Sequence, residues 1–160
     1  MNYIFSAIFL YFFLGFLLYI FQRRIIFNKS GHPGTPKDYN LDNTEEIYIK
    51  TEDNLELLSW YYKGDNSLPL LVYFHGNSFH IGDRAYRIQR YIEKNWSVLL
   101  VSWRGFGGNK GDPTEKNLYK DAEAVLKWIK NNTEFKFKEL VIYGESLGSG
   151  VALEIGTKYK

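Results

Sequence analysis

The chain has 160 residues, of which 45% are hydrophobic, 18% aromatic and 24% charged, and none is cysteine. This length and composition predict one domain with a buried core and exclude a chain that is mostly disordered. The absence of cysteine excludes a disulfide scaffold, a cysteine nucleophile and a Cys-ligated metal. Three of the 20 Lys+Arg lie in the first 30 residues, which leaves 17 against 18 Asp+Glu in the remainder. Such a near-neutral body offers no basic surface for nucleic acid.

The first feature along the chain is an apolar run over residues 3–21, YIFSAIFLYFFLGFLLYIF. As a helix it would be about 28 Å long, close to the roughly 30 Å hydrocarbon thickness of a bilayer. A cleaved signal peptide would begin with basic residues and end in small ones, and a helix apolar on all sides is unlike the core helix of a small domain. We therefore expect residues 1–27 to form a single-pass anchor in a lipid bilayer. Arg23, Arg24 and Lys29 follow the run and predict a cytoplasmic body.

Residues 28–40 contain several Gly and Pro breaks and show no apolar periodicity. This pattern predicts a linker, with His32 as a solvated loop residue, between the anchor and a body over residues 41–160.

The body alternates apolar strands with amphipathic helices. A hairpin is expected first, with strands Glu46–Lys50 and Leu55–Tyr62 around residues 52–54. Three continuous apolar strands then follow, over Leu68–Phe74, Ser97–Trp103 and Glu139–Tyr143. Helices are expected over residues 83–94, from Asp112 onward, and from about Leu147. For the second helix, Asp112 is the expected N-cap, Pro113 the first helical residue, and Glu115 the partner in a capping box.

This order predicts an α/β domain whose parallel sheet carries an antiparallel hairpin at one edge. Ligands of such sheets bind at the carboxyl ends of the strands. The loops after Phe74, Trp103 and Tyr143 are therefore the candidates for a functional site.

The third of these loops reads Gly144-Glu-Ser146-Leu147-Gly148 between a strand and a helix. This is the G-x-S-x-G nucleophile elbow, in which a sharp turn exposes a strained serine. The amide of Leu147 is the expected first donor to an oxyanion. The second is expected from the loop after Phe74, from Asn77 or the residue after it.

Other candidate sites are less supported by the residues. His75 is expected to brace its loop, and a metal site made of His75, His80 and Asp83 has no matching ligand spacing. The glycine-rich segment 105–111 does not fit a nucleotide-binding pattern. No metal or organic cofactor is implied.

Three segments together carry a resemblance to a family: HGNS (75–78), WRGFGGNKGDPTEKNLYKDAEAV (103–125) and GESLGSGVA (144–152). They resemble the membrane-anchored α/β-hydrolase-domain proteins, serine hydrolases of the esterase, lipase and protein-depalmitoylase kind. The resemblance implies the α/β-hydrolase fold and the hydrolysis of an acyl ester or thioester through an acyl-enzyme on Ser146.

The same resemblance implies a catalytic Asp and His that follow the nucleophile along the chain. No histidine follows Ser146, and the fold is expected to be truncated after the helix behind the elbow. We therefore expect the N-terminal part of a serine hydrolase that is inactive or weak alone. It is either the truncated product of a disrupted reading frame or one piece of a split enzyme, in which a second polypeptide would complete the sheet and the triad. The alternative is a non-catalytic, membrane-tethered binding module derived from a hydrolase.

Overall fold

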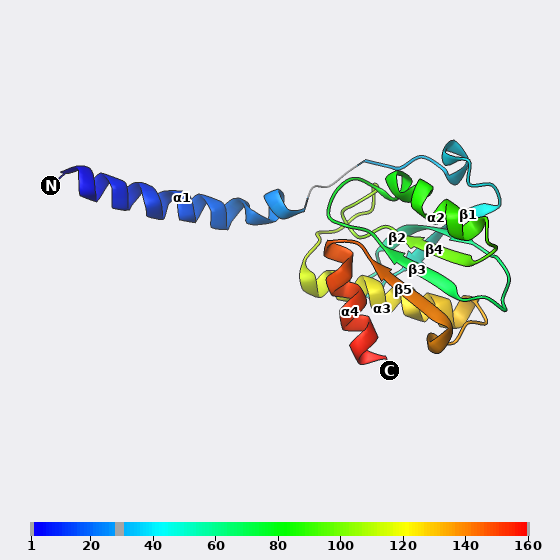
Figure 1. Ribbon diagram of the computed structural model, residues 1–160. Coiled ribbons are helices and arrows are strands. Elements are labelled where there is room, and N and C mark those ends of the chain that lie inside the picture. Colours follow the sequence, from blue (N-terminus) through cyan, green and yellow to red (C-terminus); the bar gives the residue numbers. More distant parts are fainter. Residues whose placement is uncertain (1, 28–30, 160) are drawn as a thin grey trace.

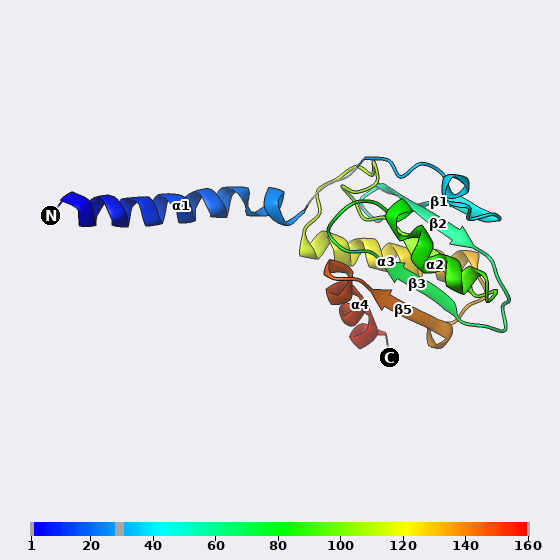
Figure 2. The same cartoon turned by 45° about the horizontal axis from the view of Figure 1, so that its top comes forward.

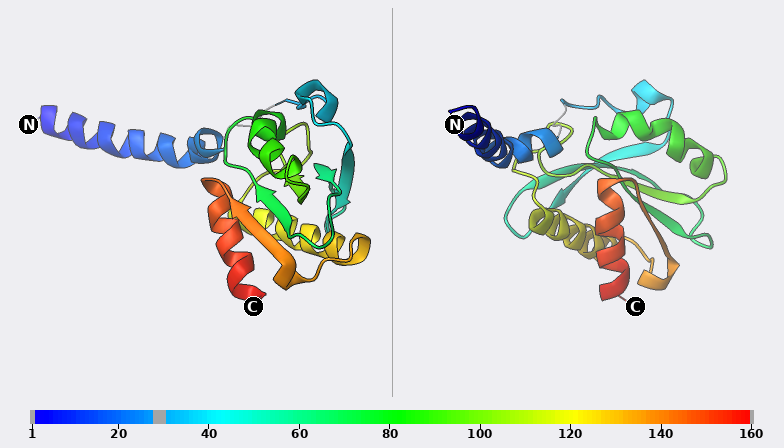
Figure 3. Two further views of the ribbon diagram at one scale, coloured as in Figure 1. Left: turned by 45° about the vertical axis from the view of Figure 1, so that its right-hand side comes forward. Right: turned by 60° about the vertical axis from the view of Figure 1, so that its left-hand side comes forward.

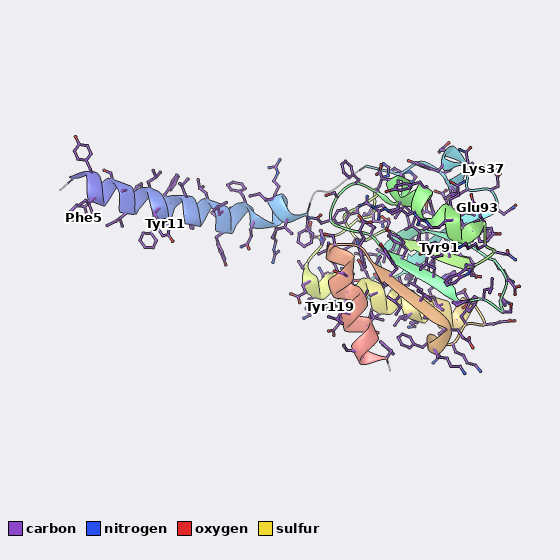
Figure 4. All side chains as sticks on the ribbon, in the orientation of Figure 1. Phe5, Tyr11, Lys37, Tyr91, Glu93 and Tyr119 are labelled. Carbon is purple, nitrogen blue, oxygen red and sulfur yellow. The ribbon has the colours of Figure 1, made fainter. Side chains whose placement is uncertain are left out.

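The computed structural model describes residues 2–27 and 31–159, so residues 28–30 of the expected linker, Lys29 included, lie outside the described residues. A long helix, α1 (Asn2–Ile26), projects from one side of a domain formed by the rest of the chain (Figure 1). Its side chains, Phe5 and Tyr11 among them, stand out around the helix and are exposed (Figure 4). By length and composition, Tyr3–Ile26 could cross a membrane, and none of its most apolar stretch is buried in the domain.

The domain is built on a five-stranded mixed sheet. Its strands are β1 (Thr44–Lys50), β2 (Glu56–Tyr62), β3 (Leu70–Phe74), β4 (Ser97–Val101) and β5 (Leu140–Gly144), in the order β1-β2-β4-β3-β5. The β1–β2 and β2–β4 pairs are antiparallel, and β3 is parallel to both β4 and β5. The predicted parallel sheet with an antiparallel hairpin at one edge is confirmed.

Helices cover both faces of this sheet (Figure 3). Helices α3 (Glu115–Asn132) and α4 (Leu147–Lys158) lie on one face, and α2 (Ala85–Ile92), preceded by a 3-10 turn at Ile81–Arg84, lies on the other. Successive side chains of a strand alternate between the faces. Val72 of β3 accordingly packs in the core that contains the α3 and α4 side chains, whereas Tyr73 packs in the core that contains Ile88 of α2.

Strand β5 is covered on one face only. Leu140 and Ile142 pack against the α3/α4 core, whereas Val141 and Tyr143 remain 38% and 39% exposed. These two residues are paired in register with Leu71 and Tyr73 of β3 and so face the same side as α2. Helix α2 thus shields β3 but leaves the neighbouring strand open, and β5 is also the last strand of the sheet.

The start of α3 differs from the prediction. Thr114, and not Asp112, is the N-cap: its backbone is extended (φ −143°, ψ 157°) and its hydroxyl accepts the amide N–H of Asn117 at 3.2 Å. Both residue types cap helices well. Here the Asn117 side chain donates to the Asp112 carbonyl at 3.0 Å, so Asp112 contacts the first turn of α3 through its backbone from the loop that precedes the cap. Glu115 is the first helical residue and accepts the Tyr119 hydroxyl, so the predicted capping box is wrong.

Much of the segment expected to be a linker is packed on the domain. Pro33 and Pro36 are buried, and residues 36–39 form a 3-10 turn. The Tyr39 ring lies 5.5 Å from that of Trp60, and its hydroxyl donates to the Pro33 carbonyl at 2.7 Å. His32 is exposed, as expected. Aromatic burial by Tyr39 therefore fixes a stretch whose Gly and Pro content alone suggested flexibility.

Candidate active site at the carboxyl ends of β3 and β5

Ser146 lies at a sharp turn between β5, which ends at Gly144, and α4, which begins at Leu147. Its backbone has φ 49° and ψ −113°, a region that residues with a side chain rarely adopt. The side chain is exposed. The turn between β5 and α4 lies on the side of the domain toward which β3 and β5 run (Figure 2). The backbone is thus strained where the sequence predicts the nucleophile elbow.

The glycines on either side of Ser146 are needed for this turn. A Cβ at Gly144 would lie 2.4 Å from the Gly148 carbonyl oxygen, and one at Gly148 would lie 2.2 Å from the Phe74 carbonyl oxygen. Both neighbours are backbone atoms, which have no alternative rotamer. The two glycines therefore let the first turn of α4 pack directly against the ends of β3 and β5.

The loop after β3 lies against the elbow. The Glu145 amide donates to the Phe74 carbonyl at 2.9 Å, and a Cβ at Gly76 would lie 3.3 Å from Cβ of Ser146. Asn77 follows Gly76 directly. Leu147 directly follows Ser146 and is the first residue of α4, so its amide N–H has no acceptor within its own helix. The structure thus brings together the loops that contain Ser146, Leu147 and Asn77.

Arg84 joins the same two loops from the other direction. It is 7% exposed, and its Nε and Nη2 donate to the Glu145 carboxylate at 3.2 and 3.0 Å. Its Nη1 donates to the carbonyls of Ser78 at 2.9 Å and His80 at 3.5 Å. Tyr73 adds a hydrogen bond from its hydroxyl to Glu145 at 2.8 Å. One guanidinium therefore fixes the loop after β3 relative to the turn that holds Ser146.

This interaction also sets the ionisation of Glu145. Burial alone would raise the pKa of its carboxyl group, but the bonds from Arg84 and Tyr73 outweigh burial and lower it. Burial and the Glu145 carboxylate together raise the pKa of Tyr73. Sequence reasoning did not find Arg84, because nothing local in the chain connects residues 84 and 145.

Comparison with known proteins places this fold and elbow in a family. A family model described as serine aminopeptidase, S33 (Hydrolase_4) matches residues 66–160. The chain belongs to this family of α/β hydrolases. The predicted family and fold are thereby confirmed.

Three similar proteins, two from yeasts and one from an archaeon, are compared with this chain. Protein bem46 of Schizosaccharomyces pombe is 31% identical over 91% of this chain and 51% of its own length. The uncharacterized membrane protein YNL320W of Saccharomyces cerevisiae is 30% identical over 89% of this chain and 52% of its own length. The structure of the Pyrococcus furiosus esterase Pf2001 superposes with a TM-score of 0.61 and 27% identity, over 75% of this chain and 46% of that one. The chain thus spans about half the length of these curated relatives.

His75 and His80 both lie in the loop after β3. His75 is fully buried: its Nε2 lies 3.5 Å from the Trp103 amide, and its ring lies 5.4 Å from that of Phe106. Burial lowers the pKa of His75 to about 3, so the ring is neutral and supports its loop from within, in line with the predicted bracing role. Nδ1 of His80 lies 2.9 Å from the Asp83 carboxylate. Within residues 2–27 and 31–159, no group of three His, Asp or Glu side chains is arranged to hold a metal ion.

Proposed function

We propose that Ser146 is the nucleophile of an acyl ester or thioester hydrolysis. The observation that carries the proposal is the strained, exposed backbone of Ser146 between a parallel strand and a helix, inside an α/β-hydrolase fold. Its hydroxyl would attack the acyl carbon while a base takes the proton. The amides of Leu147 and Asn77 would donate to the carbonyl oxygen as it becomes negative. The alcohol or thiol leaves with a proton, and water then hydrolyses the acyl-enzyme.

The base and its orienting acid are proposed to come from polypeptide outside these 160 residues. All three histidines precede Ser146 along the chain, and His75 is buried and held neutral. A serine hydroxyl without a base is a poor nucleophile near neutral pH, although oxyanion donors alone retain some rate. We therefore expect these residues alone to be inactive or weak. The missing groups would come from a continuing or a separate polypeptide.

A fluorophosphonate probe tests both statements, because its reaction requires an activated serine. We expect weak labelling of the full chain in detergent, an increase when imidazole is added as an external base, and loss of that increase in Ser146→Ala. Ser67→Ala, which removes an exposed serine elsewhere, is the matched control and should label like the wild type. Strong labelling without imidazole would show that a base is already present. Equal labelling of Ser146→Ala would show that Ser146 is not the nucleophile.

The uncovered face of β5 supports the proposal that further polypeptide packs on the sheet, beside α2. Val141 and Tyr143 are exposed there at the open edge of the sheet, and open apolar edges associate. The same surface would serve the alternative function, in which the chain only binds a partner. Replacing both residues with lysine should reduce self-association in detergent, measured by sedimentation. Tyr48→Lys changes an exposed tyrosine of β1 at the opposite edge and should have little effect. Equal effects would refute a role for β5.

We further propose that α1 anchors the domain in a bilayer as a single pass. The length and apolar surface of Tyr3–Ile26 support this, as does the description of YNL320W as a membrane protein. Arg23 and Arg24 in its last turn favour a domain on the cytoplasmic side. Protease digestion of sealed vesicles of known orientation tests the side: the domain should be cleaved from the cytoplasmic face and protected from the other.

A further inference from the structure

The loop after β3 is in contact with the end of α1. The Asn77 side-chain amide donates to the Ile26 carbonyl at 2.7 Å. Phe27, the next residue, packs against the α3/α4 core of the domain, and its amide continues the helix by donating to the Arg23 carbonyl at 2.9 Å. The last turn of α1 is therefore fixed at the edge of the sheet where Ser146 lies.

The position of this contact along α1 corresponds to the headgroup layer of a bilayer. The continuous apolar run ends at Phe21, five residues before Ile26, which is about 7.5 Å along a helix. The polar layer on each side of the hydrocarbon is about 5–8 Å thick. Arg23 and Arg24, suited to phosphate groups, lie between these points. With α1 across the membrane, Asn77 lies near the outer boundary of the headgroups.

Phe79, two residues further along, exposes an aromatic ring from this loop. It is 60% exposed and has a positive φ of 62°, which a residue with a large side chain rarely adopts. Arg84 binds the carbonyls on both sides of it, those of Ser78 and His80. The domain thus keeps the ring outward at a cost in backbone strain.

We infer that residues 77–79 form a membrane-contacting loop, with the ring of Phe79 in the headgroup region of the bilayer that α1 spans. Phenylalanine is among the apolar residues that enter the boundary between headgroups and acyl chains when a segment lies at a membrane surface. The guanidinium beside the loop is balanced, since Arg84 is paired with Glu145. The contact therefore does not need anionic lipid.

The inference rests on the proposed anchor and gives it a consequence for the site. Gly76, which lies against Ser146, directly precedes this loop. A loop in the headgroups would present the elbow to the membrane surface, so acyl esters or thioesters whose chains reside in the bilayer are the substrate class with direct access. The surface contact itself can be measured whether or not Ser146 reacts.

The test uses the absence of cysteine to attach a fluorophore at single sites of the full chain in phosphatidylcholine vesicles. The probe position is Phe79→Cys. Ser67→Cys, an exposed site in the connection that leads into the amino end of β3, is the control for a domain surface in water. Gly15→Cys, which has nothing within 4 Å in the middle of α1, reports on the anchor. We expect the label at 79 to be quenched by a headgroup-depth nitroxide lipid and protected from iodide, and the label at 67 to behave in the opposite way.

The outcomes separate the contact from the anchor. If the label at 15 is protected from iodide but the label at 79 is as accessible as that at 67, the anchor stands and the loop contact is wrong. If the label at 15 is itself accessible to iodide, both are wrong. Because Phe79→Cys removes the ring, hydrogen exchange on the unlabelled chain provides a second measurement. Exchange at residues 76–80 should be slower in vesicles than in detergent. Phe79→Ser should lose that protection, and Tyr48→Ser should keep it. Equal loss in both variants would overturn the inference.

Discussion

Replacing Gly148 with alanine should reveal how closely the elbow is packed. Gly148 lies in the first turn of α4, and the added Cβ would be 2.2 Å from the Phe74 oxygen, 2.7 Å from its carbonyl carbon and 2.9 Å from the His75 oxygen. An ordinary contact is about 3.5 Å. The end of β3 and the start of α4 would therefore have to separate by about 1 Å.

The magnitude follows from two opposing effects. Overpacking in a well-packed region costs about 1–3 kcal/mol and occasionally more. The upper end applies here because all three neighbours are backbone atoms. Alanine gains about 0.5–1 kcal/mol over glycine within a helix. We expect a net loss of about 2 kcal/mol in the free energy of unfolding, from about 3 kcal/mol lost to overpacking and about 1 kcal/mol gained in the helix.

Urea unfolding of the full chain in detergent, followed by tryptophan fluorescence, measures this loss. The four tryptophans, Trp60, Trp96, Trp103 and Trp128, all lie in the domain, so the signal is independent of α1.

Gly150→Ala is the matched control in the same helix. Among the described residues, no atom outside the neighbouring backbone of its own helix lies within 4 Å of its Cβ position, so it should stabilise the domain by about 0.5–1 kcal/mol. If Gly148→Ala is as stable as Gly150→Ala, the close approach of α4 to β3 is wrong.

Three further predictions use the same unfolding assay. Asp121 is fully buried and accepts three hydrogen bonds from Arg104, so Asp121→Asn should cost about 3–5 kcal/mol. Asp53 binds the same guanidinium but is 37% exposed, so Asp53→Asn should cost about 1 kcal/mol or less, and equal costs would contradict the role of burial. Thr114→Ala should cost about 1 kcal/mol through loss of the N-cap, and no change would restore Asp112 as the cap. Because burial lowers the pKa of His75 from 6.5 to about 3, the unfolded chain binds an extra proton between these values and stability falls as pH falls. From pH 7.5 to 5.0 the loss should be about 2 kcal/mol, and a His75→Gln variant that shows the same loss would refute this origin.

Much of the fold could be predicted because its signals are local. The alternation of apolar strands with amphipathic helices predicts a covered parallel sheet, and the strand ends differ from the prediction by only a few residues. The elbow is equally local: Gly144 and Gly148 allow a turn that would otherwise bring side chains against backbone. Local sequence was less decisive where two residues were equally suited to one role, as with Asp112 and Thr114 at the start of α3.

The contacts that position the site could not be predicted, because they join distant parts of the chain. Arg84 and Glu145 are 61 residues apart, and no local sequence pattern connects them. Asn77 and Ile26 are 51 residues apart. The first pair requires that β3 and β5 be adjacent, and the second requires that the end of α1 lie against the loop after β3. The sequence of residues 33–39 likewise predicts a flexible connection, whereas in the structure Tyr39 packs against Trp60 and fixes it.

The sequence by itself determined the apolar helix, the strand–helix alternation and the position of Ser146 in its turn, because each depends on spacing and backbone freedom within a few residues. Only the tertiary structure decided which strand is left uncovered, which guanidinium fixes the elbow, and which loop lies at the end of α1. These depend on the order of strands in the sheet and on burial, where a charged group such as Arg84 is stable only beside the carboxylate and carbonyls that the fold brings to it.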